Sequence, residues 1–469
     1  MMHKPLHAIF KQGKLVSAML LAGALAGCAQ SVDMQEQQVS LTQFVSDTQI
    51  GEQNEGASEN NWWRRLDSPQ LNNLVTDALA MNHDLKTSQL QLDAAIARLG
   101  AARADYYPQG SLSVGAERSS LDGAITRQSN AGVNVNWQLD LFGRITALVD
   151  AANAGALNQA EQLRALQVEV VSAVVQGYVS YQGNVQKQAI IEMQIEALEQ
   201  SIDVLKARVE EGVANELDLN RTLAQLKQQQ ALIPELSYLQ YRDLATLAVL
   251  TGRLASDITL IEEPELLSHE FSVSFNKASE AMALRPDITS ALYQFSQAYS
   301  LSVAASKALL PDISLAGFAG VVSLTSNGLE DTVQQWQVTP KVEWSLLSYP
   351  ALLAQRDAQQ FLSEAAYSDY QSKVLKAISD SELTLQRLVK QQQQLSYADQ
   401  RFNYANKAFG QAQAMYQEGQ IPYLELLDAR QDVLIAQENA VDSTIASLQA
   451  KVSAYQAFNG RWSFELNNL

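Results

Sequence analysis

Two carboxylates in the last fifty residues of the chain have the spacing of a small charged site. Glu425 and Asp428 are three residues apart, so on a helix they share one face. They follow Gly419, and Asp218 follows Gly212 at the matching place in the first half of the chain. Acids grouped in this way attract cations and resist anions, but acids near a helix start can also simply complement the helix dipole and the solvent. The spacing alone leaves both interpretations open.

Residues for catalysis or metal binding are scarce. Beyond residues 1–27 the histidines are His83 and His269, and neither has a second histidine at metal-binding spacing. The sequence contains no Gly-x-Ser-x-Gly motif and no phosphate-binding loop. Its 51 acidic against 33 basic residues argue against nucleic acid as a partner. We therefore expect no enzyme, no metal site and no cofactor, and we expect a partner to supply any energy.

Cys28 is the only cysteine, and its setting predicts a lipid anchor. A positively charged start is followed by an apolar run, residues 15–26, that is too short to span a bilayer comfortably. The small residues Leu25-Ala26-Gly27 before the cysteine resemble the lipobox of bacterial lipoproteins, in which cleavage leaves a lipid-bearing cysteine as the first residue. An ordinary thiol is the plain alternative. By that resemblance residues 1–27 are a signal peptide, and Ala29 favours sorting to the outer membrane.

The chain repeats one plan, with a shift of a little over 200 residues. Several motifs recur in the same order, which makes chance a poor explanation. Each half predicts a helix of about 30 residues that ends before a proline, a strand pair, a very long helix, a glycine-marked turn and a returning helix. The recurring motifs are Ala101–Pro108 with Ala304–Pro311, Val135–Leu139 with Val342–Leu346, and Leu217–Leu219 with Leu424–Leu426.

The long helices carry a coiled-coil seam. Apolar residues from Ile191 to Val209 step by four and three residues in turn, and those from Leu395 to Tyr416 do the same. The first long helix, at about 145–210, would measure on the order of 100 Å. Glycine tolerates the left-handed turn that stops a helix. The sequence therefore predicts two antiparallel helical hairpins with tips near Gly212 and Gly419.

Alternating segments between the helices predict strands. From Val133 to Leu141 apolar and polar residues alternate, which gives a strand one apolar and one polar face. The segment from Trp336 to Leu346 alternates in the same way, although Pro340 weakens its assignment to a central strand. Two further strands are expected at 112–118 and 313–324, with polar loops at 119–130 and 325–335.

Four such strands have a membrane-crossing length but are too few to seal themselves. No later segment resembles a transmembrane helix, so any spanning structure must consist of strands. The smallest barrels of this kind have about eight strands. Two, three or four copies that each contribute four strands would all close a barrel. A small soluble sheet that caps a helical rod is the alternative.

Taken together, these motifs resemble the TolC-like outer-membrane factors, and most closely their lipoprotein branch that serves resistance-nodulation-division efflux pumps. The resemblance covers essentially the whole chain after the signal peptide, and it rests on the order and duplication of the motifs. One departure is Leu347-Ser348-Tyr349-Pro350, where many relatives have a Phe-Asp-Gly-Gly-like turn. The motifs are the lipobox, Asn61–Trp63, Leu71 with Leu74, Asn82–Leu85, Trp137–Arg144, Glu211–Ala214, Arg285–Asp287, Leu310-Pro311 and Tyr423–Ala429.

The resemblance implies a mainly α fold with a small membrane β part, built on a duplicated helical-hairpin unit. It implies a homotrimer in which a 12-helix α-barrel continues into a 12-stranded transmembrane β-barrel. Such a trimer would be a passive exit duct, lipid-anchored in a Gram-negative outer membrane and extending into the periplasm, for drugs or other small toxic compounds. The implied partners are a periplasmic adaptor (membrane fusion protein), an inner-membrane resistance-nodulation-division pump and outer-membrane lipid. It further implies a periplasmic gate at Asp428, Glu425 and Asp218, and adaptor-contact tips at Gly212, Val213, Ala214, Gly419, Ile421 and Pro422.

Three other functions compete with this one. A duct for type I protein secretion shares the fold, and a structural coiled-coil lipoprotein would have no pore. A lipoprotein hydrolase is the weakest, because no catalytic constellation is present. The expected segments are a signal peptide (1–27), a lipidated N-terminal and equatorial part (28–71), a first helix (72–109), two strands (110–143), a hairpin (144–253), an equatorial linker (254–276), a second-repeat helix (277–311), two strands (312–348), a second hairpin (349–458) and an equatorial tail (459–469).

Overall fold

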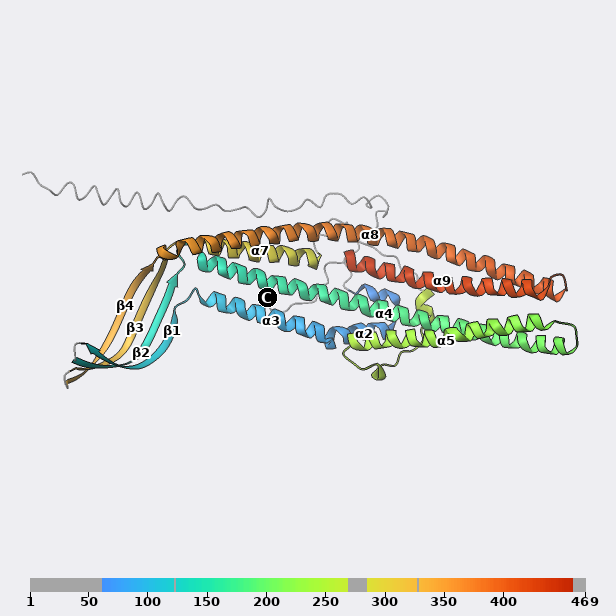
Figure 1. Ribbon diagram of the computed structural model, residues 1–469, viewed down its shortest axis with the longest axis horizontal. Coiled ribbons are helices and arrows are strands. Elements are labelled where there is room, and N and C mark those ends of the chain that lie inside the picture. The colour runs from blue at the N-terminus through green and yellow to red at the C-terminus, as the bar shows by residue number, and fades with distance from the viewer. Residues whose placement is uncertain (1–60, 122–123, 269–284, 327–328, 459–469) are drawn as a thin grey trace, which may run out of the picture. The chain divides into compact units, whose positions relative to one another are not determined.

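The computed structural model describes residues 61–121, 124–268, 285–326 and 329–458 (Figure 1). The predicted signal peptide at 1–27, the predicted lipidation site Cys28 and the tail at 459–469 lie outside the described residues, as do parts of the segments 28–71, 254–276 and 277–311. Among the described residues, no helix is both long and apolar enough to cross a membrane.

The first half begins with the turn η3 (Trp62–Leu66) and the helices α2 (Pro69–Met81) and α3 (His83–Ala104). The prediction of one continuous helix here was wrong, because the backbone of Asn82 is extended and the chain starts a new helix. The side-chain oxygen of Asn82 accepts hydrogen bonds from the backbone N–H groups of Asp84, at 2.9 Å, and Leu85, at 3.0 Å. Such an N-cap satisfies backbone donors that a helix start leaves free.

After α3 the chain forms the strands β1 (Gln109–Leu121) and β2 (Ala124–Leu139) and then the predicted hairpin. Its arms are α4 (Arg144–Glu210), with 67 residues, and α5 (Glu216–Leu250), with 35. Leu198, Ile202 and Leu226 are buried between these arms, and Ile195, Leu219 and Leu223 pack against them. The structure therefore confirms the first coiled-coil seam.

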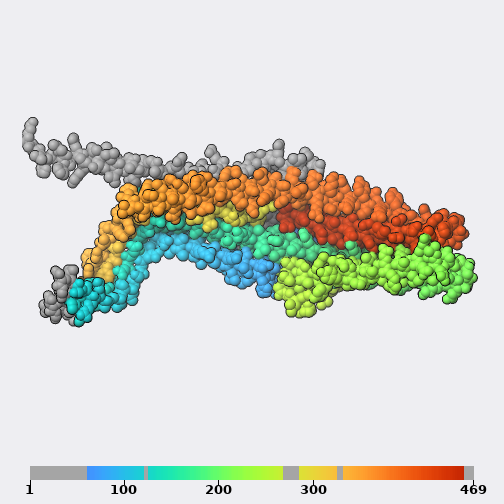
Figure 2. All heavy atoms as spheres, viewed as in Figure 1, coloured from blue at the N-terminus to red at the C-terminus, as the bar shows by residue number. Residues whose placement is uncertain are grey.

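The second half follows the same order. After the short turns η4 (Ala255–Asp257) and η5 (Pro264–Ser268), it contains α7 (Pro286–Lys307), β3 (Asp312–Ser326), β4 (Leu329–Glu343), the turn η6 (Leu346–Ser348), α8 (Tyr349–Gln417) and α9 (Tyr423–Phe458). Figure 2 shows the α8–α9 hairpin, in orange and red, lying along the green α4–α5 hairpin. The seam residues of α8 from Leu395 to Tyr416 are half-buried, and most of the residues between them are exposed.

The four strands form one antiparallel sheet in the order β1-β2-β3-β4. The predicted loops at 119–130 and 325–335 were largely wrong, because β1 pairs with β2 as far as Leu121 and Ala124, and β3 pairs with β4 as far as Ser326 and Leu329. Backbone hydrogen bonds continue along a hairpin to its turn whatever the polarity of its side chains. Pro340 lies in the edge strand β4, where its missing N–H is tolerated.

Candidate functional site: hairpin tips and a two-faced sheet

Both hairpins turn where the sequence predicted. Gly212 and Gly419 have φ angles of 71° and 70°, in the left-handed region that glycine adopts without strain. At the first tip, the N–H of Val213 donates to the carbonyl oxygen of Arg208 at 2.8 Å, and at the second the N–H of Gln420 donates to that of Met415 at 2.9 Å. The two tips therefore end their long helices with the same hydrogen-bonded turn.

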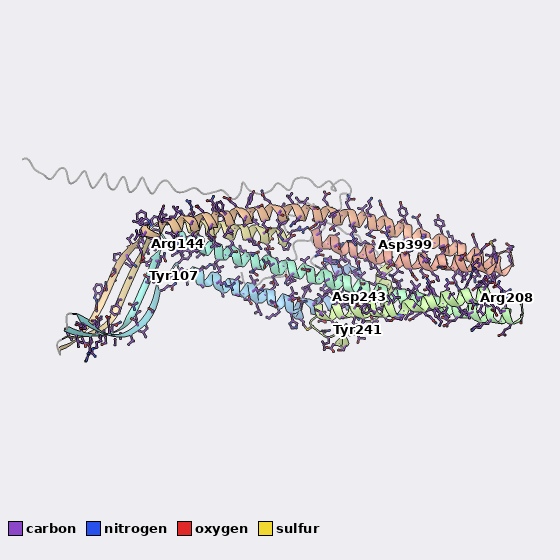
Figure 3. All side chains as sticks on the ribbon, in the orientation of Figure 1. Tyr107, Arg144, Arg208, Tyr241, Asp243 and Asp399 are labelled. Carbon is purple, nitrogen blue, oxygen red and sulfur yellow. The ribbon has the colours of Figure 1, made fainter. Side chains whose placement is uncertain are left out.

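Aromatic and polar side chains join the tips to each other. Arg208 of α4 donates to the hydroxyl of Tyr416 of α8 at 2.6 Å (Figure 3 labels Arg208). The rings of Tyr416 and Tyr423 meet edge to face with centroids 5.5 Å apart, and the hydroxyl of Thr222 lies 3.3 Å from that of Tyr423. The sequence did not predict these contacts. Its one indication was that Tyr416 is the last residue of the apolar seam on α8.

The predicted gate residues lie at this end of the hairpins. Glu425 and Asp428 are exposed on the first turns of α9, and with the described residues neither carboxylate forms an ion pair or a side-chain hydrogen bond. Asp218 is half-buried on α5, one turn before Thr222, whose hydroxyl donates to the Asp218 carbonyl oxygen at 2.8 Å. The Thr222–Tyr423 contact thus brings the starts of α5 and α9, and the acids that they carry, to the same end.

The predicted tip residues form a small and partly apolar surface. Val213 is 65% exposed, Pro422 is exposed, and Ala214 and Ile421 are half-buried. Of these, only Val213 is a large exposed side chain. The exposed long side chains of Glu211, Glu418 and Gln420 flank the two glycines, so the apolar surface has a polar border.

Farther from the tips, the two hairpins meet through polar side chains. Arg430 of α9 donates to the hydroxyl of Ser201 of α4 at 2.9 Å, and Lys187 of α4 forms an ion pair with Asp442 of α9. Burial lowers the pKa of the Arg430 guanidinium below its usual value. Polar bonds also join the arms of the first hairpin, where Asn184 of α4 donates to Asp243 of α5 at 2.9 Å, and buried apolar residues of α4 and α9 lie in one core cluster. Both kinds of contact therefore combine apolar packing with polar groups that must stay paired.

The sheet has two chemically different faces. One row of side chains across the four strands is Leu112, Val133, Ala319 and Trp336, and the next row, on the opposite face, is Ser111, Asn134, Phe318 and Gln337. We call these the apolar face and the polar face. On the central strands the apolar face is the more exposed, since Val133 is 46% exposed and Ala319 is exposed, whereas Asn134 and Phe318 are half-buried. A water-soluble sheet would show the opposite arrangement.

The two edges of the sheet are open. Among the described residues, β1 pairs only with β2 and β4 pairs only with β3, so each edge presents unpaired backbone groups. An exposed edge of 13 or 15 residues invites pairing with another strand.

Side chains fix the sheet to the helices at two equivalent places. Trp137, at the end of β2, donates from Nε1 to the carbonyl oxygen of Tyr106 at 3.0 Å. Trp344, after β4, donates to the carbonyl oxygen of Leu309 at 3.1 Å. In the first half Arg144 also forms an ion pair with Asp312 of β3 at 3.2 Å. These bonds set the position of the strands relative to the ends of α3 and α7.

The sequence profile described as outer membrane efflux protein matches residues 74–253 and 278–460. Among curated proteins, the chain is 25% identical over 466 residues to the probable efflux pump outer membrane protein TtgC of Pseudomonas putida, covering 96% of each chain. It is 26% identical over 451 residues to the cation efflux system protein CusC of Escherichia coli O157:H7, covering 94% of this chain and 97% of the relative.

Solved structures with the same fold include the outer-membrane channel OprN, with a TM-score of 0.80 and 25% identity over 86% of this chain and 93% of that one. The CmeC outer membrane channel of Campylobacter jejuni has a TM-score of 0.78 and 21% identity, over 88% of this chain and 90% of that one. The long hairpins joined to a four-stranded sheet are therefore the fold of known outer-membrane channels.

Proposed function

The chain belongs to the outer membrane efflux protein family, and we propose that three copies of it form the exit duct of a tripartite efflux system. In this proposal the duct is passive and works with a periplasmic adaptor and an inner-membrane resistance-nodulation-division pump. Drugs or other small toxic compounds are the cargo, and Cys28 carries the lipid that helps to anchor each copy. The family is one of transport proteins rather than of enzymes.

The observation that carries the proposal is the combination of an exposed apolar face with two open edges. Lipid is the solvent in which exposed apolar rows such as Leu112, Val133 and Trp336 are stable. Open edges are not tolerated in lipid, because no water can satisfy their backbone groups. Pairing of the β1 edge of one copy with the β4 edge of the next satisfies both conditions. Three copies then give a closed barrel of about twelve strands, with the polar face toward a water-filled lumen.

The helices also carry surfaces that support assembly from several copies. Leu383, Tyr397 and Tyr404 lie on α8 at spacings of fourteen and seven residues, and they are 65%, 71% and 69% exposed. A seven-residue repeat of large apolar side chains is typical of a helix that packs against another helix. In a trimer, the helices of the neighbouring copy would cover this stripe.

We place the gate at the carboxylates near the tips. Around a threefold axis, Glu425 and Asp428 would repeat as a ring of acids at the periplasmic entrance, which favours cations and resists anions. Their lack of ionic partners among the described residues supports this role, because no neighbouring cation is seen to pair with either carboxylate. The tip residues Val213, Ala214, Ile421 and Pro422 are the surface that we assign to the adaptor.

Reconstitution in planar bilayers tests the duct. Purified full-length protein should run as three cross-linked chains and should give discrete ion-conducting steps. A single chain that conducts no ions in the bilayer would overturn the proposal. A strain that lacks its own exit duct should regain resistance to exported drugs when this chain is expressed with a matching adaptor and pump.

The gate has a separate test. The variant Glu425→Ala/Asp428→Ala should raise the single-channel conductance and weaken block by divalent cations, because it removes the charged ring. Asp432→Ala, one turn farther along α9, is the matched control for the loss of an acid outside the predicted gate. If the double variant conducts like the unmodified channel, the gate does not lie at these two residues.

A further inference from the structure

Phe318 is an aromatic residue on the otherwise polar row of the sheet. It lies between Asn134 of β2 and Gln337 of β4, in the row that also holds Ser111. If the polar face lines the lumen, as the proposed function requires, a trimer carries three such rings at one height in its duct. A ring of this size could either stand out into the bore or lie against the wall.

Two glycines decide between these positions. Gly132 and Gly320 are paired with each other in the next polar row, directly beside Phe318. A methyl group at Gly132 would lie 2.6 Å from Cε2 and 2.8 Å from Cζ of Phe318, and one at Gly320 would lie 2.9 Å from Cζ. The edge of the ring therefore occupies the space that two β-carbons would otherwise fill. The ring lies over the glycine pair along the wall.

The two glycines differ in what else surrounds them. A methyl group at Gly320 would collide with the backbone of β2, at Ala131 and Gly132, so a side chain there disturbs the strand pairing itself. At Gly132 two of the three nearest atoms belong to the Phe318 ring, and the third is the carbonyl oxygen of Ala319 at 2.8 Å. Of the two glycines, Gly132 is thus the one where the ring takes the larger share of the collision, although the carbonyl group of Ala319 must also shift.

We propose that Gly132 and Gly320 set the free width of the duct by giving Phe318 a place to lie flat against the barrel wall. This inference rests on the proposed function, because it requires the polar face to line the lumen. The flat ring also stabilises the sheet, since an aromatic side chain over strand glycines covers backbone that would otherwise be bare. The free width of the lumen limits the passage of bulky substrates most, so these are the substrates that the glycine pair would affect.

A cysteine at Gln337, next to Phe318 in the same row, reports on this part of the lumen directly. In purified trimers carrying Gln337→Cys, we would measure the rates of labelling by a small and by a large water-soluble maleimide. Adding Gly132→Ala should slow the large reagent by roughly threefold and the small one much less, because the displaced ring narrows the passage. Phe318→Ala added to Gly132→Ala should restore the rate, because no ring remains to be displaced.

Ala316→Phe is the matched comparison. Ala316 lies one polar row away, beside Asn136 and Thr339, and a ring there that leaned as Phe318 does would meet the row of Asn134 and Phe318, which has no glycine. It should slow the large reagent as Gly132→Ala does. Equal rates in all variants would overturn the inference, and so would slow labelling that persists in Phe318→Ala/Gly132→Ala, since that result indicates a distorted backbone.

The bilayer measurement separates this inference from the proposed function. Current from the unmodified trimer supports the duct whatever the labelling shows. If the unmodified protein carries no current, the duct itself fails. If it conducts and the labelling is insensitive to Gly132→Ala, the duct stands and only the role of the glycine pair is lost.

Discussion

The two halves of the chain solve the same structural problems with different residues, and the two junctions from strand to long helix show this best. At the first junction Asp140 accepts hydrogen bonds from the N–H groups of Ile145 and Thr146, both at 2.8 Å, and from the Thr146 hydroxyl at 2.7 Å. Gly143 allows the turn with a φ angle of 78°. At the second junction the chain forms the turn η6, and α8 starts with Pro350 in its first turn and no side-chain cap from Ser348.

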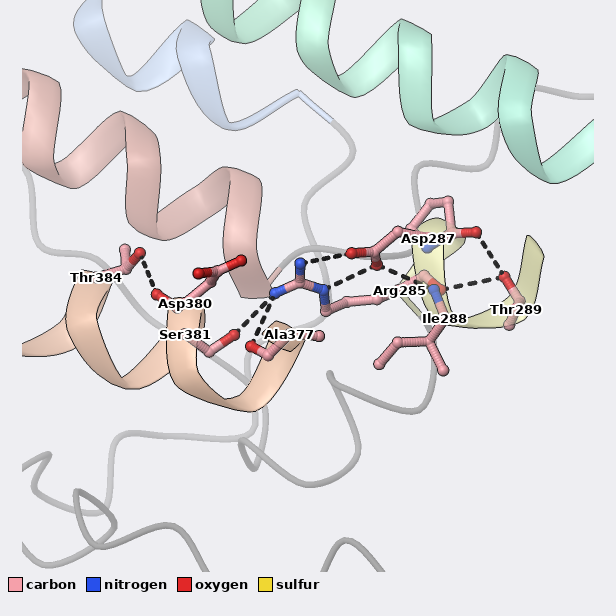
Figure 4. A network of polar contacts seen from close by, with 9 residues as sticks. Arg285, Asp287, Ile288, Thr289, Ala377, Asp380, Ser381 and Thr384 are labelled. Atoms are coloured by element: carbon pink, nitrogen blue, oxygen red, sulfur yellow. Dashed lines mark hydrogen bonds and ion pairs between the residues drawn. The ribbon is translucent and has the colours of Figure 1, made fainter. Parts of the chain in front are cut away.

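The two helices that precede the strands differ in a similar way. Asn82 and Arg285 stand 203 residues apart, as Pro108 and Pro311 do, and each precedes the first residue of its helix. Asn82 caps α3 and donates to the carbonyl oxygen of Leu250 at 2.9 Å. Arg285 instead forms an ion pair with Asp287. It also donates hydrogen bonds to two groups of α8, Ser381 Oγ at 2.9 Å and the Ala377 carbonyl oxygen at 3.3 Å (Figure 4).

The comparison teaches that the duplication preserved the task at each position rather than the residue. In the first half short side chains satisfy the helix starts locally. In the second half the start of α7 depends on a long side chain that crosses to another helix. We therefore expect substitutions at equivalent positions to have unequal effects, and the following predictions are ordered by the size of that effect.

The largest difference should appear at the starts of α3 and α7. Arg285→Ala should lower the free energy of unfolding by about 2–3 kcal/mol, because it removes the charged hydrogen bonds that the mostly buried Arg285 donates to α8, together with its more exposed ion pair with Asp287. Asn82→Ala should cost about 1–2 kcal/mol, the typical loss for an N-cap. Urea unfolding of the detergent-solubilised protein, followed by circular dichroism, measures both. Equal losses would show that Arg285 acts as an ordinary cap.

Lowering the pH gives an independent test of the ion pair between Arg285 and Asp287. Burial raises the pKa of Asp287, but hydrogen bonds and the charge of Arg285 outweigh it and bring that pKa below its usual value. The pair therefore contributes its full stability above the usual carboxyl range and loses it as the pH falls through the lowered pKa. Below about pH 4 the unmodified protein should lose stability more steeply than Arg285→Ala. Parallel pH profiles would contradict the assignment.

What the sequence could predict follows from the range of the interactions. Hairpin seams and strand alternation repeat within a few residues, so residues 191–209 and 133–141 were enough to predict helix and strand. Glycines at helix ends marked both tips for the same reason. The Arg208–Tyr416 contact joins residues 208 positions apart and depends on the register between two hairpins, which no local pattern contains. The break at Asn82 was missed because one N-cap interrupts a helical pattern that continues on both sides.

The strand lengths were missed for a different reason. The serine, threonine, arginine and glutamine residues near the hairpin ends are typical of a polar loop, yet the described residues there still pair with partners across the hairpin.

Among the predicted site residues, the structure places Glu425, Asp428 and Asp218 at one end of the hairpins, but their role in gating stays a prediction. Cys28 stays a prediction as well, because it lies outside the described residues.

A smaller difference is expected at the two junctions. Asp140→Ala should lower the free energy of unfolding by about 1–2 kcal/mol, because it removes the side-chain acceptor that caps α4. Burial raises the pKa of Asp140, but hydrogen bonds from Thr146 and neighbouring backbone groups outweigh this and lower that pKa below its usual value, as expected for a capping carboxylate. Ser348→Ala should have almost no effect, because Ser348 makes no capping bond. Thermal unfolding of both variants measures the difference, and a loss at Ser348 as large as that at Asp140 would show that the second junction has a cap after all.

The smallest effect should be the same in both halves, at the two tryptophans that fix the sheet to the helices. Trp137→Phe and Trp344→Phe each remove one indole N–H donor to a backbone carbonyl group, at 3.0 Å and 3.1 Å, and each keeps an aromatic ring. The expected loss is about 1 kcal/mol for each, the net value of an ordinary hydrogen bond.

Trp336→Phe is the matched control, because Trp336 is 79% exposed and its indole has no hydrogen-bond partner among the described residues. Equal losses at Trp137 and Trp344, beyond that at Trp336, would mean that the duplicated unit kept this bond while its helix starts diverged. A loss at only one of them would mean that the symmetry of the repeat extends to the backbone alone.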